Sequence, residues 1–130
     1  MYVANEIEIF GNKSDLKFFY DFFKFKNIKK PPNKIFYNNE YEYKQWCLNN
    51  WGTDEEMKIL NKNFVWDNLE KKLSILSITT YVPLKIINFF ALKNPYLKIK
   101  LYYYDYYNLK NGELKWENGI LEYNFVQNIN

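Results

Sequence analysis

The chain has 130 residues, a formal net charge of +3, and aromatic residues at 22% of its positions. This length and composition predict one folded domain spanning residues 1–130 and exclude an intrinsically disordered chain. The sequence contains no His, and its 18 basic residues are all Lys. His-ligated metal sites, His-dependent nucleophiles and Arg-based recognition of phosphate or guanine are therefore excluded.

Cysteine usage and the N-terminal sequence bear on the compartment. The single cysteine, Cys47, excludes an internal disulfide and is typical of a reducing cytosol. The N-terminal segment carries Glu6 and Glu8 and lacks the basic and apolar regions of a signal peptide. No apolar run is long enough to cross a membrane as a helix. We therefore expect a cytoplasmic protein.

Residue spacing in the first half predicts a strand and two helices. Alternating apolar and acidic residues indicate a half-buried strand from Val3 to Phe10. Ser14 is expected to cap a helix whose apolar stripe begins at Leu16 and which ends before Pro31. A short helix is expected from about Glu40 to Asn50.

The second half is dominated by strand patterns. We expect strands at Asn63–Asp67, Lys72–Tyr81 and Tyr96–Tyr107, and a helix at Pro83–Leu92 that begins on its proline. Two Asn-Gly pairs, at positions 111–112 and 118–119, are typical of tight hairpin turns. They predict final strands at residues 113–117 and 120–126.

The order strand-helix-strand-strand-helix-strand is the ferredoxin-like pattern. We therefore predict an α+β fold, a ferredoxin-like two-layer sandwich in which an antiparallel sheet carries two helices on one face. The short helix is an insertion in this pattern, and the last two strands form a C-terminal β-hairpin.

One segment also resembles a known family. The run Trp46-Cys47-Leu48-Asn49-Asn50-Trp51-Gly52-Thr53 resembles the Trp-Cys-x-x-Asn-Trp-Gly-Thr signature of the YubB ferredoxin-like family. Residues 5–11, 79–83 and 94–97 are similar to other conserved turns and strands of that family. The resemblance implies the ferredoxin-like fold and an origin in a phage, prophage or plasmid. It implies no particular activity.

The chain departs from the family at two places. Asp54-Glu55-Glu56 stands where the family usually has Lys-Trp-Asp, and Tyr81 stands where a Trp is usual. Any function that depends on the missing Lys and Trp is not carried over.

The first candidate binding site is the cluster of Trp46, Asn50, Trp51 and Thr53. These side chains are suited to line a pocket or a partner surface, with Asn50 supplying directional hydrogen bonds. Alternatively, the Trp rings pack the inserted helix onto the sheet, and the polar groups satisfy a turn. The sequence favours the packing interpretation.

The second candidate is the basic run from Lys24 to Lys34, which has no acidic residue and contains Lys24, Lys26, Lys29, Lys30 and Lys34. Such a run is suited to contact nucleic-acid phosphates or an acidic protein surface. Alternatively, it is the solvated C-terminal end of a helix, where Lys is favoured by the helix dipole. The second interpretation is again the favoured one.

The third candidate is one face of the strand at residues 96–107, which carries Lys98, Lys100, Tyr102 and Tyr104. Aromatic and basic side chains on an open sheet are typical of RNA-recognition domains. If the first strand is a neighbour, however, Glu6 and Glu8 neutralise these lysines in cross-strand pairs. A structural or protein-binding surface is then favoured over a nucleic-acid site.

Catalysis has little support in the sequence. We expect no catalytic residues, no metal ligands and no cofactor, and Cys47 is interpreted as a small buried apolar residue. The sequence therefore predicts a non-enzymatic protein of a phage or mobile element that acts by protein–protein interaction in the cytoplasm of a bacterial host. Inhibition of a host defence system such as a CRISPR effector is the specific hypothesis. The alternative is a nucleic-acid-binding module that uses the Lys/Tyr surface.

Overall fold

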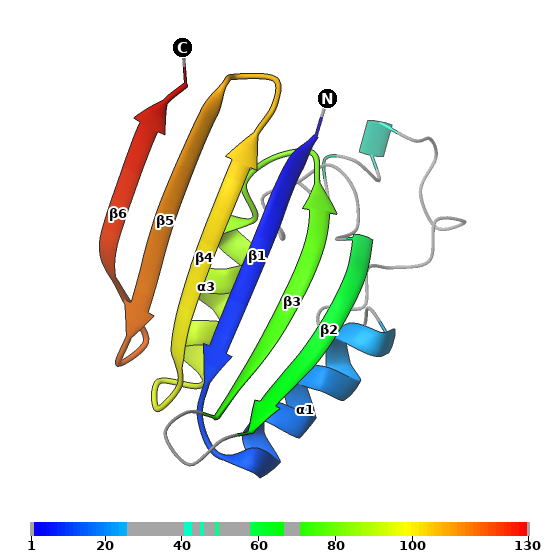
Figure 1. Cartoon of the computed structure of the whole chain (residues 1–130), viewed down its shortest axis with the longest axis vertical. Helices are drawn as coiled ribbons and strands as arrows, with labels where there is room; N and C mark the ends of the chain where they lie inside the picture. Colours follow the sequence, from blue (N-terminus) through cyan, green and yellow to red (C-terminus); the bar gives the residue numbers. More distant parts are fainter. Residues whose placement is uncertain are drawn as a thin grey trace.

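The computed structural model describes residues 2–25, 58–66 and 71–129, together with the helical positions 41, 42, 45 and 49. These residues contain six strands and two helices whose bounds are defined (Figure 1). In chain order they are β1 (Val3–Phe10), α1 (Lys13–Phe25), β2 (Lys58–Trp66), β3 (Lys71–Thr79), α3 (Leu84–Lys93), β4 (Lys98–Asp105), β5 (Lys110–Glu117) and β6 (Ile120–Asn128).

All six strands belong to one sheet in the order β2-β3-β1-β4-β5-β6, and every neighbouring pair is antiparallel. The helices α1 and α3, 13 and 10 residues long, lie behind this sheet in Figure 1. The ferredoxin-like α+β sandwich that the sequence predicted is therefore wrong, because the molecule is a mainly β fold. Two hairpins after β4 extend the same sheet, so strands rather than helices dominate the architecture.

The core lies between the helices and one face of the sheet. Alternation along β1 directs Val3, Ile7 and Ile9 to this face, where each is at most 1% exposed. Leu16 and Phe19 of α1 complete the same apolar cluster, and the ring of Phe19 meets that of Phe90 edge-on at a centroid distance of 5.5 Å. The helices therefore cover one face of the sheet, and no other described residues cover the second face, which is called the open face below.

A buried tryptophan on β5 joins this strand to α3. Trp116 on β5 is 0% exposed, and its indole Nε1 donates a hydrogen bond to Oδ1 of Asn88 on α3. A buried indole N–H without an acceptor would be costly. This bond therefore fixes α3 against β5.

The start of α1 differs from the expected cap. The side-chain Oδ1 of Asn12 accepts hydrogen bonds from the backbone N of Asp15 and from the hydroxyl of Ser14, each at 2.9 Å. Asn12 is therefore the N-cap, and Ser14 lies inside the first turn. Asn and Ser both serve as caps, so composition alone did not separate them.

One of the two predicted hairpin turns is misplaced. The turn between β4 and β5 occupies residues 106–109, and Asn111 and Gly112 lie within β5. Asp105 organises this turn, because its Oδ1 accepts hydrogen bonds from the backbone N of Tyr107 and of Asn108. The side-chain bonds of an aspartate thus replaced the expected Asn-Gly turn.

The other hairpin turn lies where the sequence predicted it. Asn118 and Gly119 join β5 to β6 with φ angles of 54° and 79°. Two successive positive φ values define the tight hairpin turn that Asn-Gly favours.

The expected short helix is described only in part. Tyr41, Glu42, Gln45 and Asn49 are helical, and the rest of the range 40–50 lies outside the described residues. Within the described part of the chain, no helix is long and apolar enough to cross a membrane.

Gly112 provides a test of this packing. A Cβ atom at Gly112 would overlap the ring of Tyr103 on the adjacent strand. We expect Gly112→Ala to destabilise the protein by about 1–3 kcal/mol, as overpacking usually does. Urea unfolding of Gly112→Ala in the wild-type and Tyr103→Leu backgrounds measures this coupling. An equal cost in both backgrounds would show that the ring is not the cause.

Candidate functional site

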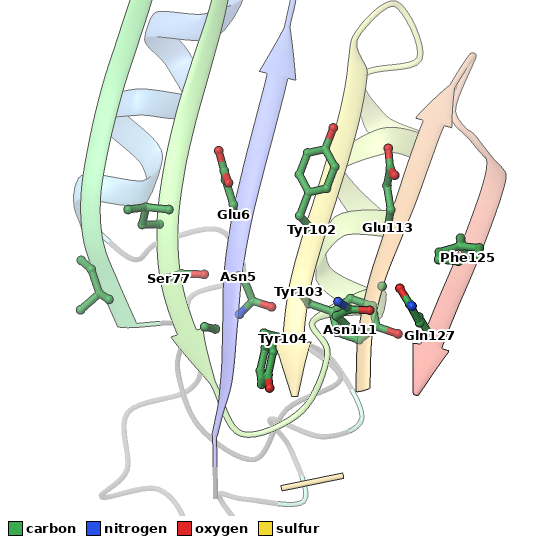
Figure 2. Close-up of a pocket in the computed structure, with 14 residues that line it drawn as sticks. Asn5, Glu6, Ser77, Tyr102, Tyr103, Tyr104, Asn111, Glu113, Phe125 and Gln127 are labelled. Atoms are coloured by element: carbon green, nitrogen blue, oxygen red, sulfur yellow. The ribbon is translucent and has the colours of Figure 1, made fainter. Parts of the chain in front are cut away.

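A groove of about 520 Å³ lies on the open face of the sheet, opposite the helices (Figure 2). It crosses the sheet from β2 to β6. Its lining residues are Ala4, Asn5, Glu6, Leu60, Leu76, Ser77, Tyr102, Tyr103, Tyr104, Asn111, Gly112, Glu113, Phe125 and Gln127. Half of these residues are apolar or aromatic and most of the others are polar, a mixture that gives the groove the character of a binding surface.

The centre of the groove is a row of side chains that are directly opposite one another on successive strands. Strand register places Leu76 beside Glu6, Glu6 beside Tyr102, Tyr102 beside Glu113, and Glu113 beside Phe125. Figure 2 shows Glu6, Tyr102 and Glu113 side by side on β1, β4 and β5. The row alternates apolar and acidic side chains, with a carboxylate on each side of the Tyr102 ring.

The next row toward the ends of β4 and β6 is uncharged. It runs from Ala4 through Tyr104 and Asn111 to Gln127. The ring of Tyr104 lies against that of Tyr106 at a centroid distance of 4.3 Å. This end of the groove therefore offers aromatic surface and side-chain amides.

Three lysines of this face, Lys72, Lys98 and Lys100, lie beyond the other end of the groove. Lys98 Nζ is 3.5 Å from Oε1 of Glu117, and Lys100 Nζ lies 5.3 Å from the centroid of the Phe10 ring. Lys72 Nζ donates to Oε2 of Glu8 at 2.7 Å. The charges of these three lysines are therefore engaged by neighbouring carboxylates and a ring.

The expected cross-strand neutralisation occurs with different partners. β1 and β4 are neighbours, as expected, and Glu8 is directly opposite Lys100. The ion pair of Glu8, however, is with Lys72 on β3, and Lys98 reaches Glu117 on β5. β1 and β4 each have two neighbouring strands. The pairing of β1 with β4 alone therefore did not determine which lysine each carboxylate contacts.

The acidic centre of the groove perturbs Tyr102. Burial raises the pKa of the Tyr102 hydroxyl above its usual value of 10.0, and the nearby charges of Glu8, Glu113 and Glu6 raise it further. A hydrogen bond from this hydroxyl to the carboxylate of Glu8 acts in the same direction. The local potential is therefore negative, which favours a cation over an anion at this point.

Two buried polar side chains also line the groove. Asn5 Nδ2 donates to Thr79 Oγ1 at 3.0 Å, whereas Asn5 Oδ1 and Ser77 Oγ have no hydrogen-bond partner within the described structure. An unsatisfied buried polar atom costs about 1–3 kcal/mol. This end of β1 and β3 is therefore less stable than the apolar centre of the sheet.

The candidate residues from the sequence are distributed unevenly over the structure. Lys98, Lys100, Tyr102 and Tyr104 all lie on the open face of β4, and the last two line the groove. Lys24 lies in the final turn of α1. The remaining candidates, Trp46, Asn50, Trp51, Thr53, Lys26, Lys29 and Lys30, lie outside the described residues.

Sequence reasoning missed the groove residues on β3, β5 and β6. Leu76, Glu113 and Phe125 were treated only as members of expected strands. Alternation within each strand indicated which face they occupy. Their alignment in one row with Tyr102 depends on strand order, which joins segments far apart in the chain.

Comparison of the chain with family models, with curated proteins and with solved structures finds no match. Among the residues that the structure describes, no group of three or more Cys, Asp or Glu is arranged to hold a metal ion. The groove is therefore interpreted from its own chemistry.

The tyrosine in the groove yields a pH-dependent prediction. Because the folded state raises the pKa of Tyr102, it holds the phenolic proton more tightly than the unfolded chain. The resulting stability is present below pH 10 and is lost as the pH rises through the folded-state pKa. We expect Glu8→Gln to lower the pKa of Tyr102, since Glu8 has the largest effect among the carboxylates that raise it.

NMR titration of the tyrosine Cζ carbons measures this change, and Glu117→Gln is the matched control on the same face. Glu117 is not among the groups that shift Tyr102. Equal titration curves for Tyr102 in wild type and Glu8→Gln would contradict the proposed electrostatic coupling.

Proposed function

We propose that the chain is a non-enzymatic protein-binding module that takes up a partner segment in the groove on its open sheet face. The observation that carries this proposal is the central row, in which two carboxylates flank an aromatic ring between exposed apolar side chains. Leu76 and Phe125 at its ends are 42% and 48% exposed. Apolar and aromatic side chains of this kind anchor protein interfaces.

The chemistry of the row also defines the partner segment. A Lys or Arg side chain placed over Tyr102 would meet the ring face and the carboxylate of Glu6. It would share the carboxylate of Glu113 with Lys115, whose Nζ lies 3.5 Å from Glu113 Oε1. Apolar side chains on either side of that cation would pack on Leu76 and Phe125. The best-fitting partner is therefore a protein segment that presents a basic residue between apolar ones.

Electrostatics favour this partner over nucleic acid. Phosphate groups require accessible positive charge, whereas the groove centre is acidic and Lys98 is engaged with Glu117. The nucleic-acid alternative would place phosphates against Glu6 and Glu113. Nucleic-acid binding is therefore the second candidate function, and the experiment below distinguishes it from peptide binding.

The resemblance of residues 46–53 to the YubB family supports an origin in a phage or another mobile element. Within that setting we propose inhibition of a host defence system, such as a CRISPR effector, as the role of the bound complex. This role is supported by the phage and plasmid origin of the YubB family. The groove itself supports only protein binding.

Selection from a displayed random-peptide library tests the proposal. We expect recovered peptides to be enriched in Lys or Arg beside apolar residues. Fluorescence anisotropy of one such peptide should show about tenfold weaker binding to Leu76→Ser and to Glu6→Gln, a loss of about 1.4 kcal/mol. Leu92→Ser is the matched control, because Leu92 is 70% exposed on α3, behind the sheet.

Two outcomes would contradict the proposal. The first is a library that yields no enriched peptide, or peptides that bind Leu76→Ser as well as wild type. The second is tight binding of labelled single-stranded DNA or RNA with a steep salt dependence, which would favour the nucleic-acid alternative.

A further inference from the structure

The last strand of the sheet, β6, pairs on one side only. It follows β5 in the strand order, and no described element lies along its outer side (Figure 1). Its residues from Glu122 to Asn128 are all exposed. A strand with one unpaired edge is a template for another strand.

The hydrogen bond of Ile129 shows which main-chain groups of β6 point outward. Ile129 N donates to Leu109 O at 2.8 Å, so Ile129 is directed toward β5. Because successive residues of a strand alternate in this direction, Asn124, Val126 and Asn128 direct their N–H and C=O groups away from the sheet. These three residues are the available pairing edge.

This edge lacks the features that usually prevent strands from pairing. Natural edges are protected by charged residues, proline or bulges. In β6 the register irregularity and the only charged residue, Glu122, both precede Tyr123. Residues 123–129 contain no charge, no proline and no glycine.

The sequence of the three residues that direct their main-chain groups outward is also symmetric about its centre. They read Asn, Val, Asn, with Val126 at the centre. In an antiparallel pair of identical strands with its two-fold axis at Val126, each valine is opposite the other. Asn124 is then opposite Asn128 of the second copy, which allows their amides to bond on both sides of the axis. A palindromic edge of this kind fits its own copy better than an unrelated strand.

We propose that β6 pairs with β6 of a second copy of this chain, antiparallel and with the two-fold axis at Val126. Exchange of both hydrogen bonds at each outward pair yields about six main-chain hydrogen bonds. The segment is uncharged, so the pairing escapes like-charge repulsion along the ladder. On the open face, Phe125 is opposite Gln127 of the second copy.

This pairing has a consequence for the groove. Phe125 and Gln127 both line the groove of their own chain. With the axis perpendicular to the sheet, the open faces of both copies lie on the same side. The two grooves therefore meet across the shared edge, and each copy contributes residues to the boundary of the other groove.

Sedimentation equilibrium from about 1 µM to about 1 mM tests the proposal. We expect a concentration-dependent dimer for the wild type. Val126→Lys places two ammonium groups directly opposite each other and should abolish the dimer. Ile120→Lys is the matched control, since Ile120 is also exposed, at 64%, but precedes the irregularity.

Mixing two variants tests the register itself. Val126→Lys and Val126→Glu should each be monomeric alone and should form a heterodimer when mixed, because the opposite charges then face each other. A monomeric wild type would overturn the proposal. So would a dimer that survives Val126→Lys, equal loss in Ile120→Lys, or failure of the mixture to dimerise. None of these readouts depends on peptide binding in the groove.

Discussion

The pairing of β1 with both β3 and β4 is the constraint on which the rest of the structure depends. β1 is antiparallel to each neighbour along all eight of its residues, so its alternation is imposed on both. A shift of one residue in either register would exchange the buried and open faces. The apolar residues of β1 therefore determine where the helices pack and, equally, which side chains are left for the open face.

The open face gains its chemistry from this alignment. Rows of side chains cross the strands, and charge differs from row to row. Lys72, Lys98 and Lys100 lie beyond one end, carboxylates flank Tyr102 in the centre, and amides with aromatic rings occupy the other end. The separation is a property of the register, since no single strand contains it. It supports our proposal that this sheet face binds a protein segment that is both apolar and basic, rather than phosphate.

Local patterns in the sequence predicted individual elements well where one interaction dominates. The strand at residues 3–10 and the turn at Asn118-Gly119 were both found, because alternation and positive φ leave clear signatures. The turn at Asn111-Gly112 was wrong, since Asp105 bonds the preceding turn and Gly112 is needed for contact with Tyr103. The fold class was also wrong, because an element order does not state how many later strands join the same sheet.

By itself, the sequence determined which residues alternate, which classes of catalysis are excluded by the absence of His and Arg, and which face of β4 carries Tyr102 and Tyr104. Only the tertiary structure decided that neither α1 nor α3 covers this face and that Glu6, Tyr102 and Glu113 form one row. It also decided that β6 lies at an edge. The physical reason is that hydrogen bonds between strands join residues as far apart as β1 and β4, and this order is invisible to patterns within a single segment.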